Sequence, residues 1–566
     1  MVFLRQRRQV LIFYCFAIAF GLMIYQLWTI QLRDGERFAL TALEQVSRSV
    51  QLEEVSRGRI LDRNLNPLSG ETLEKRAVLF PILVEDKNSA VNALGAILKT
   101  DPAALETYFS GGPCILPQPV SDEASEKITN LGLKGVLALS VRARYGERPL
   151  AAQVMGHLGK ISSIEEYNTL SRKGKKQYHF NDLVGKSGLE LFYEQELKGV
   201  RPKSAVRVYY DATGRPLAGG PEIEENISDK ERQDLVLTID AEIQKKVEEI
   251  MDRRVAKGAV VVMEAGSGDI LALAGRPAYN PGRPEEGLRD GEGDRFFDHC
   301  TALYQPGSVF KVVVAAAALE EGVVTPETEF TCNGEKDQLL PCWFHPGHGK
   351  ISFERAFAES CNPTFARVAL ELGAPKLVDY ARRMGMDSQQ VTGYPVDPDE
   401  RQNLDLIGMP DNLVNSAVGQ GPVLTTPLQV ASMINTVASG GIYYQPRLVQ
   451  SLLFDDGRTA RRFDPAEGRP VLAPATARTL QRLLEMTTAE GVGREACVPV
   501  FGSAGKTGSA QLSGENKLVN AWFAGYAPLA VPRYVVTVLV EEGASGGESA
   551  APVFKEIIED ILVKYK

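Results

Sequence analysis

The sequence predicts a membrane-anchored protein of the α+β class, and three features carry this prediction. An uncharged stretch, Gln9–Leu32, lies near the start of the chain. A helix-prone run that is apolar nearly all round, Phe310–Leu319, lies further along and is best interpreted as a buried central helix. Near the C-terminus the chain has strand-like segments at 505–511, 521–527 and 534–541. Antiparallel strands beside a buried helix make an α+β sandwich.

The N-terminal stretch is long enough to cross a bilayer. Arg5, Arg7 and Arg8 precede it, and this positive cluster places the N-terminus in the cytoplasm and the chain after Arg33 on the outer face. A cleaved signal peptide would have a shorter apolar region that ends at a small-residue site. This stretch ends instead in Tyr25–Leu32, so we expect an uncleaved, single-pass anchor.

Beyond the anchor, the 566 residues exceed the usual size of one domain. We predict three parts: a stub and anchor at 1–33, a mixed domain at 34–230, and a C-terminal domain at 231–566 that ends in an amphipathic helix at about 552–565. Gly219–Pro221 and the acidic stretch after it mark the second boundary. The net charge of −9 argues against an extended nucleic-acid surface.

Three short motifs in the C-terminal domain suggest its chemistry: Ser308-Val-Phe-Lys311, Ser360-Cys-Asn362 and Lys506-Thr-Gly508. A serine and a lysine three residues apart arise by chance about twice in a chain of this length, and Ser503–Lys506 is a second copy. Only the first copy begins a helix, where positions i and i+3 share a face, whereas on a strand they point to opposite faces. The sequence therefore predicts Ser308 and Lys311 as a nucleophile and its base.

The other two motifs supply proton handling and substrate contacts. A lysine serves as a base when burial and a second cation lower its pKa, and Lys506 is a candidate for that cation or for an anchor of a substrate carboxylate. Ser360 is predicted to relay a proton to the leaving amine, and the Asn362 amide to orient Lys311 and a substrate carbonyl. The two donors of the oxyanion hole are expected to be the backbone amides of Ser308 and Ser509.

The third motif lies on a predicted strand whose free edge can pair with an extended peptide. Gly508 lets the substrate backbone approach closely, and the hydroxyl of Thr507 is expected to contact a carboxylate.

These motifs resemble those of the penicillin-interacting serine transferases. Arg57–Asn64 and Gly185–Glu190 are similar to the paired signatures of class B (monofunctional) penicillin-binding proteins, and Lys257–Ala274 is similar to the opening hairpin of their catalytic domain. Two small departures are Leu65, where the family usually has glycine, and Ser509, where threonine is commoner. The resemblance implies an antiparallel five-stranded sheet flanked by helices, as in serine β-lactamases. It also implies an elongated pedestal for dimerisation and partner binding at 34–230.

The resemblance further implies a peptidoglycan D,D-transpeptidase that cross-links stem peptides through a serine acyl-enzyme and is inhibited covalently by β-lactams, with no cofactor required for catalysis. Its expected partners are D-Ala–D-Ala stem peptides, amine acceptors, a membrane glycan polymerase and other cell-wall assembly proteins. The Gly347-His348-Gly349 turn and Ser360-Cys-Asn362 favour the elongation or sporulation branch.

Two other functions stay open from the sequence. A D,D-carboxypeptidase or β-lactamase is the first, although a β-lactamase needs a base for deacylation and the chain has no Glu-x-x-Leu-Asn string between the second and third motifs. A non-catalytic β-lactam sensor or scaffold is the second. A sensor normally carries a cytoplasmic signalling domain, and only about nine residues precede the anchor.

Cys332, Cys342, His348 and Cys361 fall within thirty residues and form a set suited to a closed tetrahedral zinc site. This set of residues resembles the zinc-binding cluster that elongation-type class B enzymes have beside the active site. A Cys342–Cys361 disulfide is the rival interpretation, because the domain lies outside the membrane where oxidation is possible. Buried, reduced thiols are the third.

Overall fold

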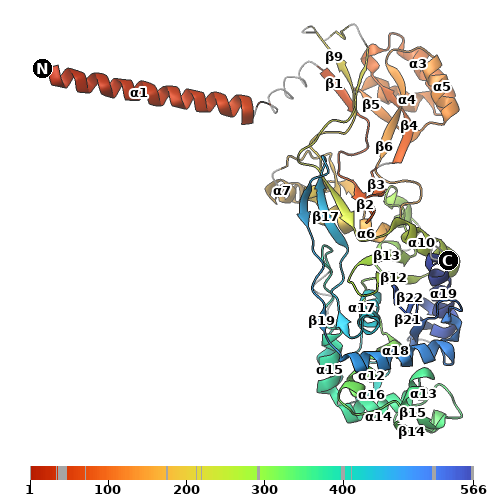
Figure 1. Ribbon diagram of the computed structural model, residues 1–566. Helices are drawn as coiled ribbons and strands as arrows, with labels where there is room; N and C mark the ends of the chain where they lie inside the picture. Colours follow the sequence, from red (N-terminus) through yellow and green to blue (C-terminus); the bar gives the residue numbers. More distant parts are fainter. Residues whose placement is uncertain are drawn as a thin grey trace. The chain divides into compact units, whose positions relative to one another are not determined.

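The computed structural model divides the chain into two compact units (Figure 1). The first comprises residues 1–56, 73–143 and 201–228, and the second comprises 57–72, 144–200 and 229–566. The structure describes residues 2–33, 35, 47–70, 72–173, 176–211, 213, 215–217, 220–289, 293–396, 402–409, 411–512 and 518–562.

This division differs from the linear one predicted from the sequence. Two stretches of the 34–230 region, 57–72 and 144–200, pack with the C-terminal part of the chain. The predicted boundaries at 33 and 230 stay predictions, and Gly219, in the turn that suggested the second one, lies outside the described residues.

The first unit begins with helix α1 (Val2–Trp28), which a short π-helical turn extends to Arg33. Its segment Leu11–Gln31 has a mean hydropathy of 1.9, and none of it is buried against the rest of the protein. A helix of this length with apolar side chains on every side matches the hydrocarbon core of a bilayer. This helix fits the predicted membrane anchor.

The rest of the first unit is a small α/β body. Strands β5 (Cys114–Pro119), β4 (Thr72–Leu79) and β6 (Val136–Ala143) form one sheet in that order. Leu79, Leu94, Leu116 and Ile128 are all fully buried between this sheet and its helices. The remaining elements are β1 (Ser47–Gln51), β9 (Ala205–Tyr209) and β10 (Glu222–Glu224), which form a second sheet, and helices α3 (Lys87–Leu98), α4 (Pro102–Ser110) and α5 (Asp122–Asn130).

The second unit is built on a five-stranded antiparallel sheet, as predicted. Its order is β13 (Ile270–Arg276), β12 (Gly258–Glu264), β22 (Tyr534–Gly543), β21 (Val519–Ala527) and β20 (Ala504–Gln511). The three predicted C-terminal strands begin and end within two residues of the observed ones. Strand β20, which carries the third motif, lies at an edge of this sheet.

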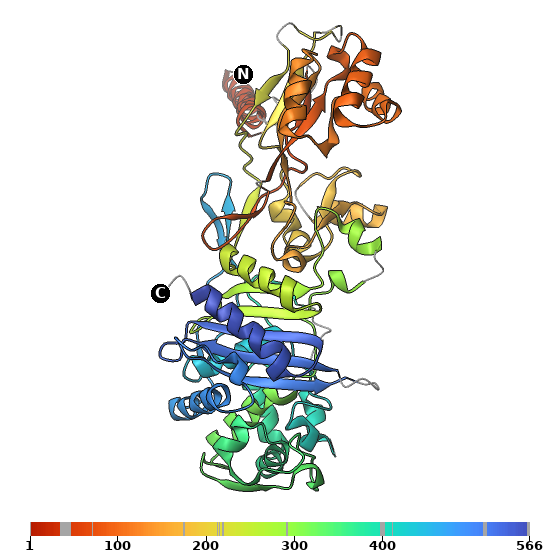
Figure 2. The same ribbon diagram turned by 90° about the vertical axis from the view of Figure 1, so that its right-hand side faces the viewer.

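Helices cover both faces of the sheet (Figures 1 and 2). Helices α10 (Ala241–Arg254) and α19 (Ala551–Leu562) pack on one face, where Phe523 and Phe554 are fully buried. Helix α17 (Pro427–Ala438) packs on the other face. The predicted terminal helix is therefore present, and its last predicted residues, 563–565, lie outside the described chain.

The predicted central helix is α12 (Lys311–Glu320), and its residues 311–318 are all buried. A 3₁₀ turn, Gly307–Phe310, precedes it, so the first motif spans the junction between this turn and the α-helix. The helix packs against α14 (Asn362–Leu372), α15 (Ala374–Arg383) and α18 (Pro474–Ala489).

Smaller elements complete the second unit. A second sheet has the order β18 (Thr459–Arg462), β17 (Val449–Phe454), β11 (Gln233–Leu237), β2 (Ile60–Leu61) and β3 (Pro67–Ser69). The others are α6 (Ala152–Met155), β7 (Leu158–Lys160), α7 (Ile164–Lys173), β8 (Leu183–Gly185), α8 (Gly188–Phe192), α9 (Glu194–Leu197), α11 (Pro284–Arg289), β14 (Glu329–Cys332), β15 (Gly349–Ser352), α13 (Phe353–Ala358), α16 (Asn412–Ser416), β16 (Ile442–Tyr443) and β19 (Arg469–Pro470).

The paired upstream signatures meet in a buried ion network inside the second unit. Arg57 Nε lies 2.9 Å from Glu190 Oε2, and Arg57 Nη1 lies 2.7 Å from Glu194 Oε2. Arg144 Nη2 approaches Glu190 Oε1 to 2.7 Å, and the Tyr145 hydroxyl donates to the same oxygen at 3.0 Å. Glu190 is therefore a structural residue that joins three stretches of chain.

Leu65 occupies a turn position whose backbone conformation glycine adopts more readily than other residues. It adopts φ 66° in the turn that follows β2, and its side chain is exposed. Two amides of this turn, those of Asn64 and Asn66, donate to Asp62 Oδ1 at 2.8 and 2.7 Å. The left-handed conformation costs an L-residue roughly 1–2 kcal/mol, so these hydrogen bonds hold the turn in place against a local strain.

We expect Glu190→Ala to lower the free energy of unfolding of the second unit by about 3–5 kcal/mol, because it leaves Arg57 and Arg144 buried without their shared carboxylate. Thermal unfolding followed by near-ultraviolet circular dichroism measures this loss. Glu123→Ala, which removes an exposed partner of Lys127, is the control and should leave the transition unchanged. A wild-type transition in the Glu190 variant would contradict the structural role.

Candidate active site

The first motif packs closely against the edge strand, β20. Gly307 has φ 56°, and its amide donates to the carbonyl of Gly419 at 3.0 Å. A Cβ at Gly307 would lie 2.9 Å from the carbonyl carbon of Ser509, and one at Gly508 would lie 2.6 Å from the carbonyl oxygen of Pro306. Only glycine fits at these contacts, so the sequence brings the start of the α12 region and β20 together with Ser308 half-buried between them.

The side chain of Lys311 connects the first motif to the second. It is fully buried, and its amine donates to Ser360 O at 2.8 Å, to Ser360 Oγ at 3.2 Å and to Asn362 Oδ1 at 2.7 Å. Burial lowers the pKa of Lys311 from 10.5 to about 7, although the nearby thiols of Cys361 and Cys342 oppose the shift. An amine with this pKa is a competent base at neutral pH.

In the described part of the chain, Lys311 makes no hydrogen bond to the Ser308 hydroxyl one turn before it. Catalytic hydrogen bonds are often long without substrate and tighten when it binds. The structure thus brings the predicted pair to the same helix start, with the amine held by the second motif.

Ser360 adopts an unusual backbone conformation between α13 and α14. Its φ is 55°, a left-handed value that is uncommon for residues other than glycine, and it is 5% exposed. Its amide donates to Phe357 O at 3.1 Å, and the next amide, that of Cys361, donates to Ala356 O at 2.8 Å. Such conformations persist only when their surroundings over-determine them.

The third motif adds a second buried amine. Lys506 lies on β20 with its side chain fully buried, and burial together with the charge of Lys311 holds its pKa well below its usual range. The carboxylate of Glu359 opposes that shift. The structure therefore brings Lys506 into the electrostatic neighbourhood of Lys311, where protonation of one amine disfavours protonation of the other.

The other two residues of the third motif, Thr507 and Gly508, are also buried. Thr507 is 6% exposed and Gly508 lies against Pro306. Strand β20 pairs with β21 on one side, and its other edge pairs with no strand in the described ranges of the chain. The hydroxyl of Ser509 accepts a hydrogen bond from Gly546 N at 3.0 Å.

The second serine–lysine copy has a different role. Ser503 is buried, and its hydroxyl donates to Ala496 O at 2.7 Å while it accepts from Val498 N at 3.3 Å. These contacts hold the loop before β20, so Ser503 is structural.

The four predicted metal ligands lie together. One ligand atom from each of Cys332, Cys342, His348 and Cys361 falls within 4.8 Å of every other, and the three cysteines are buried. The hairpin of β14 and β15 places Cys332 opposite Gly349, next to His348. All three cysteines are free thiols. A hydrogen bond from Cys361 lowers the pKa of Cys342 to about 5, and the pKa of Cys361 is raised in turn.

Sequence reasoning missed the backbone contacts that surround the motifs. Asn362 Nδ2 donates to Pro341 O at 3.2 Å, and Trp343 Nε1 donates to Glu359 O at 2.9 Å. Carbonyl acceptors leave no signature in residue type or spacing. The adjacency of Trp343 to Cys342 is the one signal that could have drawn attention to it.

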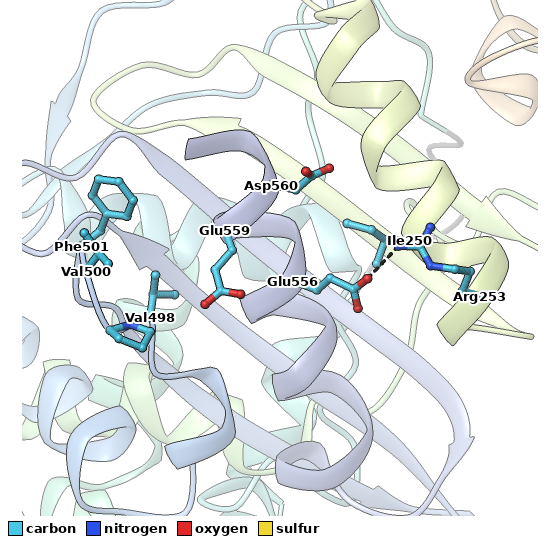
Figure 3. Close-up of a pocket in the computed structure, with 9 residues that line it drawn as sticks. Ile250, Arg253, Val498, Val500, Phe501, Glu556, Glu559 and Asp560 are labelled. Carbon is cyan, nitrogen blue, oxygen red and sulfur yellow. Dashed lines mark hydrogen bonds and ion pairs between the residues drawn. The ribbon is translucent and has the colours of Figure 1, made fainter. Parts of the chain in front are cut away.

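A separate pocket of about 490 Å³ lies on the sheet face covered by α10 and α19 (Figure 3). Figure 3 shows Glu556 and Glu559 of α19 on one side of the pocket and Val498, Val500 and Phe501 on another. It is lined by none of the catalytic motifs.

Comparisons with known proteins agree with this geometry. The family described as the penicillin-binding protein transpeptidase domain matches residues 258–559, and the family described as the penicillin-binding protein dimerisation domain matches 52–231. Stage V sporulation protein D of Bacillus subtilis is 28% identical over an alignment that covers 97% of this chain and 85% of that protein. Peptidoglycan D,D-transpeptidase MrdA of Salmonella typhimurium is 24% identical over 98% of this chain and 96% of that one.

A solved structure shows the same fold across nearly the whole chain. It is described as the structural coordination of polymerization and crosslinking by a peptidoglycan synthase complex, and it aligns with a TM-score of 0.71 and 24% identity. The alignment covers 97% of each chain.

The pKa of Lys311 predicts a pH dependence. Only the neutral amine can accept the Ser308 proton. The pKa of Lys311 is about 7, so the amine is mostly protonated when the pH is lower than this value. We therefore expect the rate constant for acylation by a fluorescent penicillin to rise between about pH 6 and 8 and then to level off. Stopped-flow measurements of the full chain in detergent test this.

Lys311→Arg is the control, because its guanidinium stays charged at every accessible pH. Its acylation should be slower by about 10²–10⁴ and should show no such rise. A wild-type rate that is flat across this range would contradict the assignment of Lys311 as the base.

Proposed function

The chain belongs to the class B penicillin-binding proteins, and from this premise we propose that it cross-links stem peptides in bacterial peptidoglycan as a D,D-transpeptidase. The family and the relatives named as transpeptidases support a penicillin-binding serine transpeptidase. The observation that carries the proposal is the Lys311 amine, which is buried, lowered in pKa and held by both polar residues of the second motif.

The first half-reaction forms an acyl-enzyme. Ser308 Oγ attacks the carbonyl of the D-Ala–D-Ala bond while Lys311 Nζ takes its proton. The oxyanion of the tetrahedral intermediate is stabilised by the amides of Ser308 and Ser509. The C–N bond breaks, the proton passes by way of Ser360 to the leaving amine, and the terminal D-alanine departs.

The second half-reaction makes the cross-link. The side-chain amine of a neighbouring stem attacks the acyl carbonyl, loses a proton to the same base, and forms an amide bond as Ser308 Oγ leaves and is reprotonated. The free edge of β20 supports an extended donor peptide in antiparallel pairing. Thr507 contacts the terminal carboxylate, and the buried amines of Lys506 and Lys311 disfavour one another's protonation, so that the site does not hold two positive charges at once.

The setting of the reaction follows from the anchor and the relatives. We assign α1 to the cytoplasmic membrane, with the N-terminus inside and the catalytic domain on the outer face. The similar structure described as coordinating polymerization and crosslinking supports a membrane glycan polymerase as a partner, together with other cell-wall assembly proteins. The elongation or sporulation branch is supported by the likeness to a sporulation protein and to MrdA.

The two other functions have less support. A β-lactamase or carboxypeptidase and a non-catalytic sensor share the three motifs, but the relatives aligned over nearly the whole chain include a named D,D-transpeptidase.

Exposure to penicillin should give one covalent adduct per chain on the peptide that contains Ser308, because that hydroxyl lies one turn before the buried base at the same helix start. Intact-protein and peptide mass spectrometry measure it. Ser308→Ala should give no adduct, whereas Ser503→Ala, in the structural copy of the motif, should still be labelled. Labelling of the Ser308→Ala chain, or rapid turnover of the antibiotic without a stable adduct, would overturn the proposal.

We also propose that Cys332, Cys342, His348 and Cys361 hold a structural zinc ion. Three buried thiols and one imidazole within mutual reach form the donor set that zinc prefers in closed sites. The lowered pKa of Cys342 favours the thiolate that a metal needs. The ion would fix the loop that carries the second motif and takes no part in the reaction.

Protein purified without chelator should contain about one zinc per chain, because four ligands are already assembled. Elemental analysis and a count of accessible thiols measure this. Cys332→Ser should lower both the zinc content and the melting temperature, whereas Cys497→Ser, outside the cluster, should change neither. Absence of zinc together with the loss of two thiols would favour the Cys342–Cys361 disulfide instead.

A further inference from the structure

The segment Pro341–Phe344 lies beside the second catalytic motif and exposes two aromatic side chains. Trp343 is 51% exposed and Phe344 is 40% exposed, and their rings lie 5.9 Å apart. An exposed tryptophan is normally held by few contacts, but this one makes a specific hydrogen bond. Trp343 Nε1 donates to the carbonyl oxygen of Glu359 at 2.9 Å.

The same segment makes a second hydrogen bond on the other side of Ser360. Asn362 Nδ2 donates to Pro341 O at 3.2 Å, which fixes the amide so that its Oδ1 faces the amine of Lys311. The residues immediately before and after Ser360-Cys361 are therefore both tied to one short segment. Between these ties, Ser360 keeps its left-handed backbone.

Trp343 is connected to the Lys311 amine through a short series of hydrogen bonds and backbone atoms. Trp343 holds the carbonyl of Glu359, the next carbonyl is that of Ser360, and Lys311 Nζ donates to it at 2.8 Å. If the 359–360 peptide were to rotate toward an ordinary conformation, the Ser360 carbonyl and hydroxyl would both move away from Lys311. The strain at Ser360 favours such a movement unless other contacts oppose it.

We propose that Trp343 is a positioning residue for the transpeptidation reaction. Its indole N–H holds the Glu359 carbonyl and thereby keeps Ser360 in the conformation that presents two oxygens to Lys311. The Pro341 carbonyl accepts a hydrogen bond from Asn362 Nδ2 and thereby keeps the amide oriented with its oxygen toward Lys311. This inference rests on the proposed function, and it concerns hydrogen bonds of the indole and of a backbone carbonyl, which are distinct from the thiols of the neighbouring cluster.

The test compares acylation of the full chain in detergent by a fluorescent penicillin. Trp343→Phe keeps an aromatic ring and removes the donor, and we expect its acylation rate constant to fall about tenfold while the affinity of the reversible complex changes less than about threefold, because a misplaced base slows the chemical step. Phe344→Leu is the matched control. It removes the adjacent exposed ring, for which the structure records no hydrogen bond to the motif, and should acylate at the wild-type rate.

A second pair of variants separates the hydrogen bond from the ring. Trp343→Gln places an N–H donor four bonds from Cα, as the indole does, whereas Trp343→Met has a similar length and no donor. We expect the glutamine variant to acylate at least about threefold faster than the methionine variant. This comparison decides the matter even if Trp343→Phe fails to fold, and melting temperatures and zinc contents are measured for every variant.

The outcomes distinguish this inference from the proposed function. If the wild-type chain forms no adduct at Ser308, the proposed function fails. If the wild type is acylated and Trp343→Phe is acylated equally fast, or if the glutamine and methionine variants do not differ, the positioning role fails and the proposed function stands. An equal loss in Phe344→Leu would also overturn it, since it would assign the effect to the exposed rings and not to the hydrogen bond.

Discussion

The burial of the Lys311 amine among neutral acceptors is the constraint on which the rest of the site depends. Its hydrogen-bond acceptors are a backbone carbonyl, a hydroxyl and an amide oxygen. Neutral acceptors orient the amine but offset only part of the cost of burying its positive charge, so burial lowers the pKa to about 7. A carboxylate in their place would hold the amine as a permanent cation. The apolar sequence of α12 keeps this amine buried, and the asparagine of the second motif supplies one of its neutral acceptors.

The sheet supplies the other half of the site. Strand β20 brings Lys506 beside that amine, and its glycine lets the strand approach the segment before Ser308. The two amides proposed as oxyanion donors come from different elements, a 3₁₀ turn and an edge strand. Close backbone packing through Gly307 and Gly508 fixes their separation, because side chains there would hold the elements apart.

Much of this could be predicted from the sequence, and the successes share a cause. The three motifs, the strands of the C-terminal part and the Cys-His set are each marked by residue type and local spacing. What could not be predicted depends on pairing between distant stretches. Strand β2 pairs in parallel with β11 through Leu61 and Val236, which places residues 57–72 in the second unit. Trp343 and Gly419 act on backbone atoms, so no pattern of polar side chains indicates them.

The three separate passages of the chain through the second unit affect how its parts can be obtained. A fragment that begins at residue 231 would keep all three catalytic motifs but would lack β2, β3, Arg57 and Glu190. Strand β11 would then present an unpaired edge, the kind of surface that promotes self-association. Removal of the first unit therefore calls for linkers that rejoin residue 72 to 144 and 200 to 229, because a cut at residue 231 would leave this edge of β11 uncovered.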